Sequence, residues 1–199
     1  MNSETFIFFG IVGSGKGTQV KLLMDFLKKK DGRECVYIGT GNIFRKILKS
    51  SDNNDPFVDQ TVKEILTSGR LMPDDKTNEL VSSVIESQLS PEKHVIFDGY
   101  PRTIPQSKFF EEKIKSKKRE DVKIIYIELT KKEAMKRNLL RGRHDDTEEG
   151  LKKRFDEYFN KVVPSMDYFK DKTGYKIYTI NGEQTIEDVH QDIIKALRY

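Results

Sequence analysis

A glycine-rich loop at residues 10–18, GIVGSGKGT, has the residue types and the spacing of a phosphate-binding site. Glycines let successive backbone N–H groups point at one centre, and the positive end of a following helix adds to the same field. Lys16 would supply a mobile positive charge for the outer phosphates. In the general pattern G-x-x-x-x-G-K-[ST] a hydroxyl residue follows the lysine, whereas here Gly17 follows it and Thr18 comes one position later. The loop predicts phosphate binding.

Arginines and acids form a second group of candidate residues. Residues 98–103 read DGYPRT, and the later cluster comprises Arg137, Arg141, Arg143, Asp145, Asp146 and Arg154. Arginine presents a planar fork of donors that suits phosphate oxygens. Several arginines around one phosphate loop imply a highly anionic ligand.

Strands and helices must alternate along the chain to bring these residues together. Short β-favouring segments predict strands at residues 5–9, 35–38, 94–97, 122–129 and 175–180, and apolar residues at helical spacing predict helices between them. This alternation predicts an α/β fold, a sheet of about five parallel strands with helices on both faces. In such a sheet the ligand lies beyond the carboxyl ends of the strands, where residues 98–103 would meet the loop.

Three local patterns predict further details of the helices. Helical segments at residues 43–48 and 58–66 precede a helix that begins at Pro73, with no strand between them, so we expect an insertion at about residues 40–72. Thr130 and Glu133 have the spacing of a capping box. A long helix should bury one face, and Pro164 bends it or begins its successor. The residues expected on that face are Leu151, Phe155, Phe159 and Val162.

Composition narrows the functional class. The 199 residues carry a formal charge of +4, and 34% of them are charged. The lysine clusters fit solvated helix ends better than a nucleic-acid-binding stripe. The single cysteine, Cys35, lies in an apolar run and is expected to be a buried thiol. We find no signal peptide before the first strand and no apolar run near the ~18 residues of a membrane span, so the cytoplasm is the expected location.

Four motifs extend over nearly the whole chain and resemble the short form of the adenylate kinases, in the nucleoside monophosphate kinase family. They are GIVGSGKGTQ, the pair GTGNIFR and GRLMPDD, FDGYPRTIPQ, and RGRHDD followed by Lys152, Lys153 and Arg154. The resemblance implies a doubly wound sheet of the P-loop NTPase type and one kinase domain over residues 1–199. Its core would comprise residues 1–39, 73–140 and 147–199, with a helical insertion that binds the monophosphate at about 40–72 and a very short lid at about 141–146.

On the donor side, the resemblance implies that ATP contacts Gly13, Ser14, Gly15, Lys16, Gly17, Thr18, Arg137, Arg141 and Gln184. A Mg²⁺ ion held by phosphates and water would lie near Thr18 and Asp98. The four-cysteine zinc lid of the long form is excluded, because the chain has one cysteine.

On the acceptor side, the resemblance implies an AMP site lined by Thr40, Arg45, Arg70, Leu71, Met72, Gly99, Tyr100, Pro101, Arg102, Gln106, Arg143 and Arg154. The amide of Gln106 both donates and accepts, so it could pair with the edge of adenine. The catalytic set would be Lys16, Arg102, Arg137, Arg143, Arg154 and Asp145, with Asp145 orienting the arginines. For Asp146 two interpretations stay open: a member of this site, or a cap of the helix that follows.

Three departures from the family pattern stand out. Val12 replaces a proline of the loop, Asn42 replaces an acid after Thr40 and Gly41, and only Gly142 separates Arg141 from Arg143. The predicted activity is reversible phosphoryl transfer from MgATP to AMP, giving two ADP, by a monomer whose partners are nucleotides. The alternatives are a UMP/CMP-type kinase, against which Thr103 and Gln106 argue, and a nucleotide-binding kinase homologue with little turnover, which the shortened lid favours.

Overall fold

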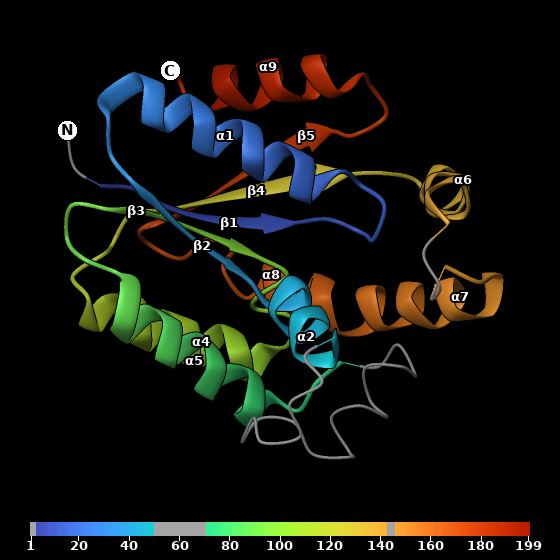
Figure 1. Ribbon diagram of the computed structural model, residues 1–199, viewed down its shortest axis with the longest axis horizontal. Helices are drawn as coiled ribbons and strands as arrows, with labels where there is room; N and C mark the ends of the chain where they lie inside the picture. Colours follow the sequence, from blue (N-terminus) through green and yellow to red (C-terminus); the bar gives the residue numbers. More distant parts are fainter. Residues whose placement is uncertain (1–2, 50–70, 143–145) are drawn as a thin grey trace.

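A parallel sheet forms the centre of the computed structural model, which describes residues 3–49, 71–142 and 146–199. Within them the sheet has five strands in the order β2-β3-β1-β4-β5 (Figure 1). The strands are β1 (Thr5–Phe9), β2 (Cys35–Gly39), β3 (His94–Asp98), β4 (Val122–Glu128) and β5 (Tyr175–Asn181). All neighbouring pairs run parallel. The predicted α/β fold with five parallel strands is confirmed.

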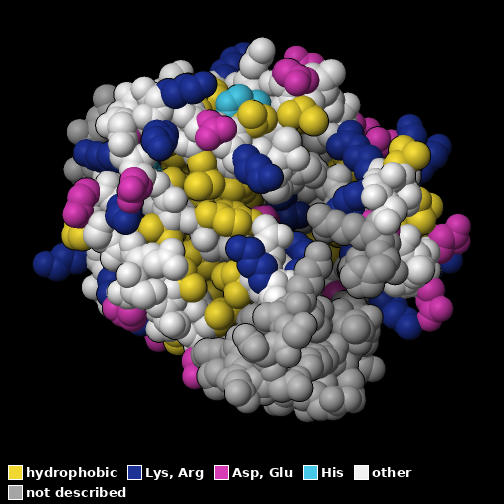
Figure 2. Space-filling model, in the orientation of Figure 1, with side chains coloured by type: hydrophobic (Ala, Val, Ile, Leu, Met, Phe, Trp, Pro, Cys, Tyr) yellow, Lys and Arg dark blue, Asp and Glu magenta, His cyan; other side chains and the backbone are white. Residues whose placement is uncertain are grey.

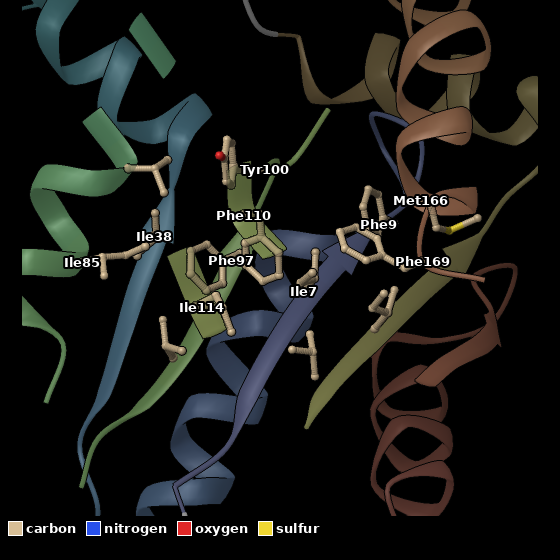
Figure 3. Close-up of a cluster of buried hydrophobic side chains, with 14 of the residues drawn as sticks. Ile7, Phe9, Ile38, Ile85, Phe97, Tyr100, Phe110, Ile114, Met166 and Phe169 are labelled. Carbon is tan, nitrogen blue, oxygen red and sulfur yellow. The ribbon is translucent and has the colours of Figure 1, made fainter. Parts of the chain in front are cut away.

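Alternating side chains of β1 pack into two separate apolar layers. Ile7 and Phe9 belong to one layer together with Phe97 of β3, and Phe6 and Phe8 belong to the other. All five residues of β1 are buried, as expected for a central strand that is covered on both faces. Figure 3 shows the first layer, in which Phe97 and Phe110 meet edge to face with ring centroids 5.0 Å apart.

Helices cover both faces of the sheet. Helices α1 (Lys16–Asp31) and α9 (Ile186–Ala196) lie against one face, and Figure 1 shows them side by side. Helices α4 (Asp74–Gln88), α5 (Ile104–Ser116) and α8 (Val163–Asp167) supply side chains to the layer on the other face. No helix in the described part of the chain is both long enough and apolar enough to cross a membrane.

The helices at the carboxyl ends of the strands are α2 (Thr40–Lys49), α6 (Lys131–Arg141) and α7 (Glu148–Glu157). Helix α2 forms the described start of the predicted insertion; the helix expected at residues 58–66 lies outside the described residues. Thr130 caps α6, because its hydroxyl accepts from the N–H of Glu133 at 3.3 Å. In place of the reciprocal bond of a capping box, the N–H of Thr130 donates to Oε1 of Glu183 at 3.2 Å, and the Glu133 carboxylate accepts from Arg137.

A π-helical turn, η1 (Tyr158–Val162), joins α7 to α8 and corrects the predicted buried face. Leu151 and Phe155 are buried as expected, but Phe159 is 40% exposed and Tyr158 takes the buried position. A π turn contains more residues than an α turn, so the side chains after Phe155 rotate relative to an uninterrupted helix. Pro164 stands in the first turn of α8, in agreement with its beginning a successor helix. Cys35 is partly rather than fully buried.

Candidate functional site

The phosphate loop lies at the end of the sheet where β1 leads into α1, and α2, α6 and α7 lie at the same end (Figure 1). Gly15 precedes α1 and has φ = 87°, so the helix begins without a side-chain cap. The first N–H groups of α1 are therefore left available to an anion. Figure 2 shows several Lys and Arg side chains at this end of the molecule.

Lys16 folds back over its own loop. Its Nζ donates to the carbonyl oxygens of Gly10 at 2.6 Å and Ile11 at 3.1 Å, and to Oγ of Ser14 at 3.4 Å. Burial lowers the pKa of Lys16 to about 8; Asp98 opposes this shift, while Arg102 and Arg141 add to it. These three residues come from β3, the segment after β3, and α6. The chain thus brings charges from separate segments to the loop.

Asn138 of α6 supports the loop from outside and was not among the predicted residues. It is fully buried, and its Nδ2 donates to the carbonyl of Val12 at 2.9 Å. A Cβ on Gly13 would lie only 2.4 Å from this nitrogen, and Gly13 has φ = 90°, which favours glycine. Ala134, Asn138 and Arg141 are spaced so that they lie on one face of a helix. A polar residue on the same face as the predicted Arg141 was the sequence signal that could have identified Asn138.

Asp146 anchors two of the predicted arginines. Its side chain is fully buried. Its carboxylate accepts from Nε and Nη2 of Arg141 at 2.9 and 2.8 Å, and from Nη2 of Arg154 at 2.9 Å. Helix α7 is capped by Thr147, whose hydroxyl accepts from the N–H of Gly150 at 3.1 Å. The interpretation of Asp146 as the helix cap was therefore wrong, because its carboxylate faces the arginines. Arg143 and Asp145 lie outside the described residues.

The predicted donor-side residues Arg137 and Gln184 form hydrogen bonds with neighbouring residues. Nε of Arg137 donates to Oε1 of Glu133 at 2.9 Å. Gln184 follows β5, and its Nε2 donates to the carbonyl of Asn181 at 3.0 Å and to Asp192 at 2.8 Å. Arg137 and Arg141 are one helical turn apart, yet they take different carboxylate partners.

Two of the residues predicted for the acceptor side bind the carbonyl oxygen of Gly99. It accepts from the hydroxyl of Thr40 and from Nε of Arg102, both at 2.7 Å. Gly99 has φ = 74°, and a Cβ there would lie 2.5 Å from Nη2 of Arg102, so this position requires glycine. A Cβ on Gly41 would lie 3.4 Å from Nη1 of Arg45 and 3.7 Å from Nη2 of Arg102. The two guanidinium groups therefore converge above Gly41.

Gln106 is almost fully buried, and hydrogen bonds hold both ends of its amide. Oε1 accepts from the N–H of Arg102 at 2.8 Å, and Nε2 donates to Oδ1 of Asp74 at 2.8 Å. The same Asp74 oxygen accepts from the hydroxyl of Thr103 at 2.8 Å. Asp74 belongs to the GRLMPDD motif but was not among the predicted site residues; a contact between α4 and α5 cannot be recognised from spacing along the chain.

The remaining predicted acceptor residues differ in exposure. Met72, Tyr100 and Pro101 are buried, and Leu71 is partly buried. The hydroxyl of Tyr100 donates to Oδ1 of Asn78 at 2.6 Å, which attaches the segment after β3 to α4. Arg70 lies outside the described residues.

Asp98 and Thr18 offer oxygen atoms beside the loop. Asp98 ends β3, and a Cβ on Gly17 would lie 4.0 Å from its Oδ2. Thr18 is exposed in the first turn of α1. A carboxylate and a hydroxyl are the hard oxygen ligands that Mg²⁺ prefers, and Mg²⁺ usually keeps several waters. The donor set therefore fits this ion.

Known proteins resemble the chain over almost all of its length. The family model for adenylate kinase matches residues 8–174. An adenylate kinase of Bacteroides fragilis is 34% identical over 195 residues, with 96% of each chain covered. Adenylate kinase 1 of a Nostoc species is 32% identical over 191 residues, covering 96% of this chain and 97% of the relative. An adenylate kinase of Rickettsia conorii is 33% identical over 227 aligned positions, covering 96% and 98%. With its phosphate loop, its arginines and this similarity, the chain belongs to the adenylate kinase family.

Proposed function

We propose that the chain catalyses reversible phosphoryl transfer from MgATP to AMP, giving two ADP. One observation carries the proposal: Lys16, Arg102 and Arg141 come from three separate segments, yet lie close enough for the two arginines to lower the pKa of the lysine. Such a concentration of positive charge suits a ligand with several adjacent phosphates. It is the arrangement expected where the phosphates of two nucleotides meet.

The donor phosphates would lie on the loop of residues 13–18, with Lys16 at the outer phosphates. Arg141 and Arg154, with Arg143, would neutralise the charge of the phosphoryl group during transfer, and Arg137 and Gln184 would contribute to the donor site. Asp145 would orient the arginines, and we add Asp146 because of its bonds to Arg141 and Arg154. No side chain is needed as nucleophile, since the attacking oxygen belongs to the acceptor phosphate. Positioning and charge neutralisation by these side chains then supply the catalysis.

Mg²⁺ would be held by phosphates and water near Thr18 and Asp98. When bound, it neutralises phosphate charge and fixes the donor phosphates in one arrangement. The chain's own contribution is to orient the carboxylate of Asp98, whose Oδ2 accepts from the hydroxyl of Tyr37 at 3.1 Å.

The acceptor phosphate would bind between Arg45 and Arg102, with Thr40 and Gly99 shaping the site. Arg70, Leu71, Met72, Tyr100 and Pro101 would line the remainder. Gln106 would select adenine: each of its amide atoms makes one bond in the structure, which leaves one acceptor position and one donor position for the base. Asp74 can only accept from Nε2, so it presents the amide in one orientation.

A direct assay tests this assignment. Purified protein receives MgATP with AMP, CMP, UMP, GMP or dTMP in turn, and diphosphate formation is measured. We expect turnover with AMP. Turnover with CMP or UMP but not with AMP would indicate the UMP/CMP-type kinase, and ATP binding without turnover would indicate the nucleotide-binding kinase homologue.

The base contact has its own test. Gln106→Ala should lower kcat/KM more for AMP than for CMP, with Gln88→Ala, at an exposed position of α4, as the matched control. Equal losses for the two substrates would contradict the role of Gln106 in base selection.

The expected setting of the enzyme is also a proposal. We propose a cytoplasmic monomer whose partners are small nucleotides, supported by the dispersed surface charge and the single cysteine. Light scattering of the purified protein tests the monomer.

A further inference from the structure

A chain of three hydrogen bonds connects an acceptor-side arginine to the end of a central strand. Nη2 of Arg45 donates to Oδ1 of Asn42 at 2.5 Å. Nδ2 of Asn42 donates to the hydroxyl oxygen of Tyr37 at 2.8 Å. That hydroxyl donates to Oδ2 of Asp98 at 3.1 Å. This chain of hydrogen bonds begins on α2, passes through Tyr37 of β2 and ends on β3.

Each link in this chain has one possible direction. A guanidinium group only donates and a carboxylate only accepts, so the two ends set the orientation of the groups between them. The amide of Asn42 turns its oxygen to Arg45 and its nitrogen to Tyr37, and the Tyr37 hydroxyl is left to donate to Asp98. An ionised acid at position 42, as in the family pattern, has no proton to donate to Tyr37. The asparagine that departs from this pattern is therefore the residue that completes the chain.

Gly39 makes room for the tyrosine. A Cβ at this position would lie 2.2 Å from the Tyr37 hydroxyl oxygen and 2.4 Å from the ring carbon that bears it. The Tyr37 ring thus occupies the space of a side chain at position 39. The Tyr37 hydroxyl is thereby held between Asn42, from which it accepts, and Asp98, to which it donates.

The two ends of the chain differ in how firmly they are held. Asp98 is partly buried at the end of β3, which pairs with strands on both sides, whereas Arg45 is exposed on α2. The guanidinium of Arg45 is nevertheless directed toward Gly41, where Arg102 also points. An exposed arginine samples many rotamers unless a partner holds it. Asn42 is that partner, and Tyr37 in turn holds Asn42.

We propose that Tyr37 and Asn42 are positioning residues that hold Arg45 in place for the phosphate of the acceptor nucleotide. The proposal rests on the proposed function, because it takes Arg45 as a phosphate ligand. It also assigns a role to the departure at position 42. The asparagine lacks the negative charge of the usual acid, but its amide nitrogen can donate to the Tyr37 hydroxyl.

The test compares Asn42→Asp, Tyr37→Phe and the double variant with the wild type. AMP affinity is measured by titration calorimetry without ATP or Mg²⁺, and KM is measured separately for AMP and ATP. Each single variant should weaken AMP binding about tenfold, as expected when one positioned charged contact is loosened. The KM for ATP should change less than twofold. The double variant should bind AMP with about the affinity of the single variant that binds it more weakly. Both substitutions interrupt the same chain of hydrogen bonds, so their effects should not add.

The controls separate positioning from general damage. Tyr178→Phe removes a tyrosine hydroxyl on the opposite edge strand, β5, and should leave AMP affinity unchanged. Thermal unfolding identifies variants that bind poorly because they are unfolded; Tyr37→Phe keeps the ring and serves if Asn42→Asp does not fold. Unchanged AMP affinity in Tyr37→Phe, or losses that multiply in the double variant, would overturn the proposal. If the wild type uses another monophosphate, the proposed substrate fails and the same variants are measured with that monophosphate.

Discussion

Replacing Lys16 with methionine should abolish turnover and, at the same time, stabilise the nucleotide-free protein. The pKa of Lys16 is lowered from 10.5 to about 8, chiefly by burial. Below pH 8 the folded protein carries a charged amine that is better solvated in the unfolded chain. The gap between 10.5 and about 8, at ~1.36 kcal/mol for each pH unit, corresponds to roughly 3 kcal/mol. Methionine also loses the hydrogen bonds to the Gly10 and Ile11 carbonyls, so we expect a net gain of ~1–3 kcal/mol at pH 7.

The stability difference between Lys16→Met and the wild type should depend on pH. Between pH 8 and 10.5 the unfolded chain binds a proton at Lys16 that the folded chain does not, so the wild type gains stability as the pH rises through this window. Lys16→Met lacks this gain. The free-energy advantage of the variant should therefore be largest at or below pH 8 and shrink toward pH 10.5. Other titrating groups cancel in the difference between the two proteins.

Urea unfolding followed by circular dichroism at pH 7, 8, 9 and 10 measures that difference. Lys21→Met, at an exposed position of α1, is the matched control and should show no such trend. A Lys16→Met variant less stable than the wild type at pH 7, or a stability difference that does not vary with pH, would refute the proposed cost of burying the Lys16 amine. Near-normal turnover in Lys16→Met would contradict the assignment of Lys16 to the donor phosphates.

Three further predictions concern other buried groups. Asp146→Asn should lower the free energy of unfolding by about 3 kcal/mol in urea titrations and reduce kcat, because it removes the charge that pairs with two arginines; unchanged stability would refute this. Gly13→Ala should lower the melting temperature and weaken ATP binding, because the new Cβ would lie 2.4 Å from Nδ2 of Asn138. Adding Asn138→Ala should restore part of both, and the absence of any recovery would count against that contact. Burial raises the pKa of Cys35 to about 12, so iodoacetamide should label the native protein at pH 8 at least ~1000-fold more slowly than the urea-unfolded chain, and comparable rates would contradict the burial.

The sheet could be predicted because its evidence is local. Apolar strands and the glycine loop each lie within a few consecutive residues. Parallel strands joined through a helix connect in a right-handed sense, and this restricts how the elements can be arranged in space. Because ligands bind beyond the carboxyl ends of parallel strands, Asp98 at the end of β3 and Arg102 shortly after it are also expected near the loop. Asp98 and Arg102 indeed lie close enough to Lys16 to affect its pKa, and Asp98 also affects the pKa of Arg102.

The choice of hydrogen-bond partner could not be predicted in the same way. Gln106 binds Asp74, which is 32 positions away in sequence, and Tyr37 binds Asp98, which is 61 positions away. Such pairs depend on how helices and strands pack, so neither the composition of the sequence nor the spacing of its residues indicates them. The exposure of Phe159 was missed for a related reason, because a period of 3.6 residues assumes that the helix has no π turn.

The bond network of Asp146 has a consequence for how tightly nucleotides can bind. An arginine side chain that becomes ordered only when its ligand arrives gives up as much as ~2 kcal/mol of rotamer entropy at that moment. Arg141 and Arg154 are already ordered by one carboxylate, so much of that entropy is lost when the chain folds. Nucleotide binding would therefore not have to offset the cost of ordering the two arginines that are proposed to neutralise the phosphoryl group during transfer.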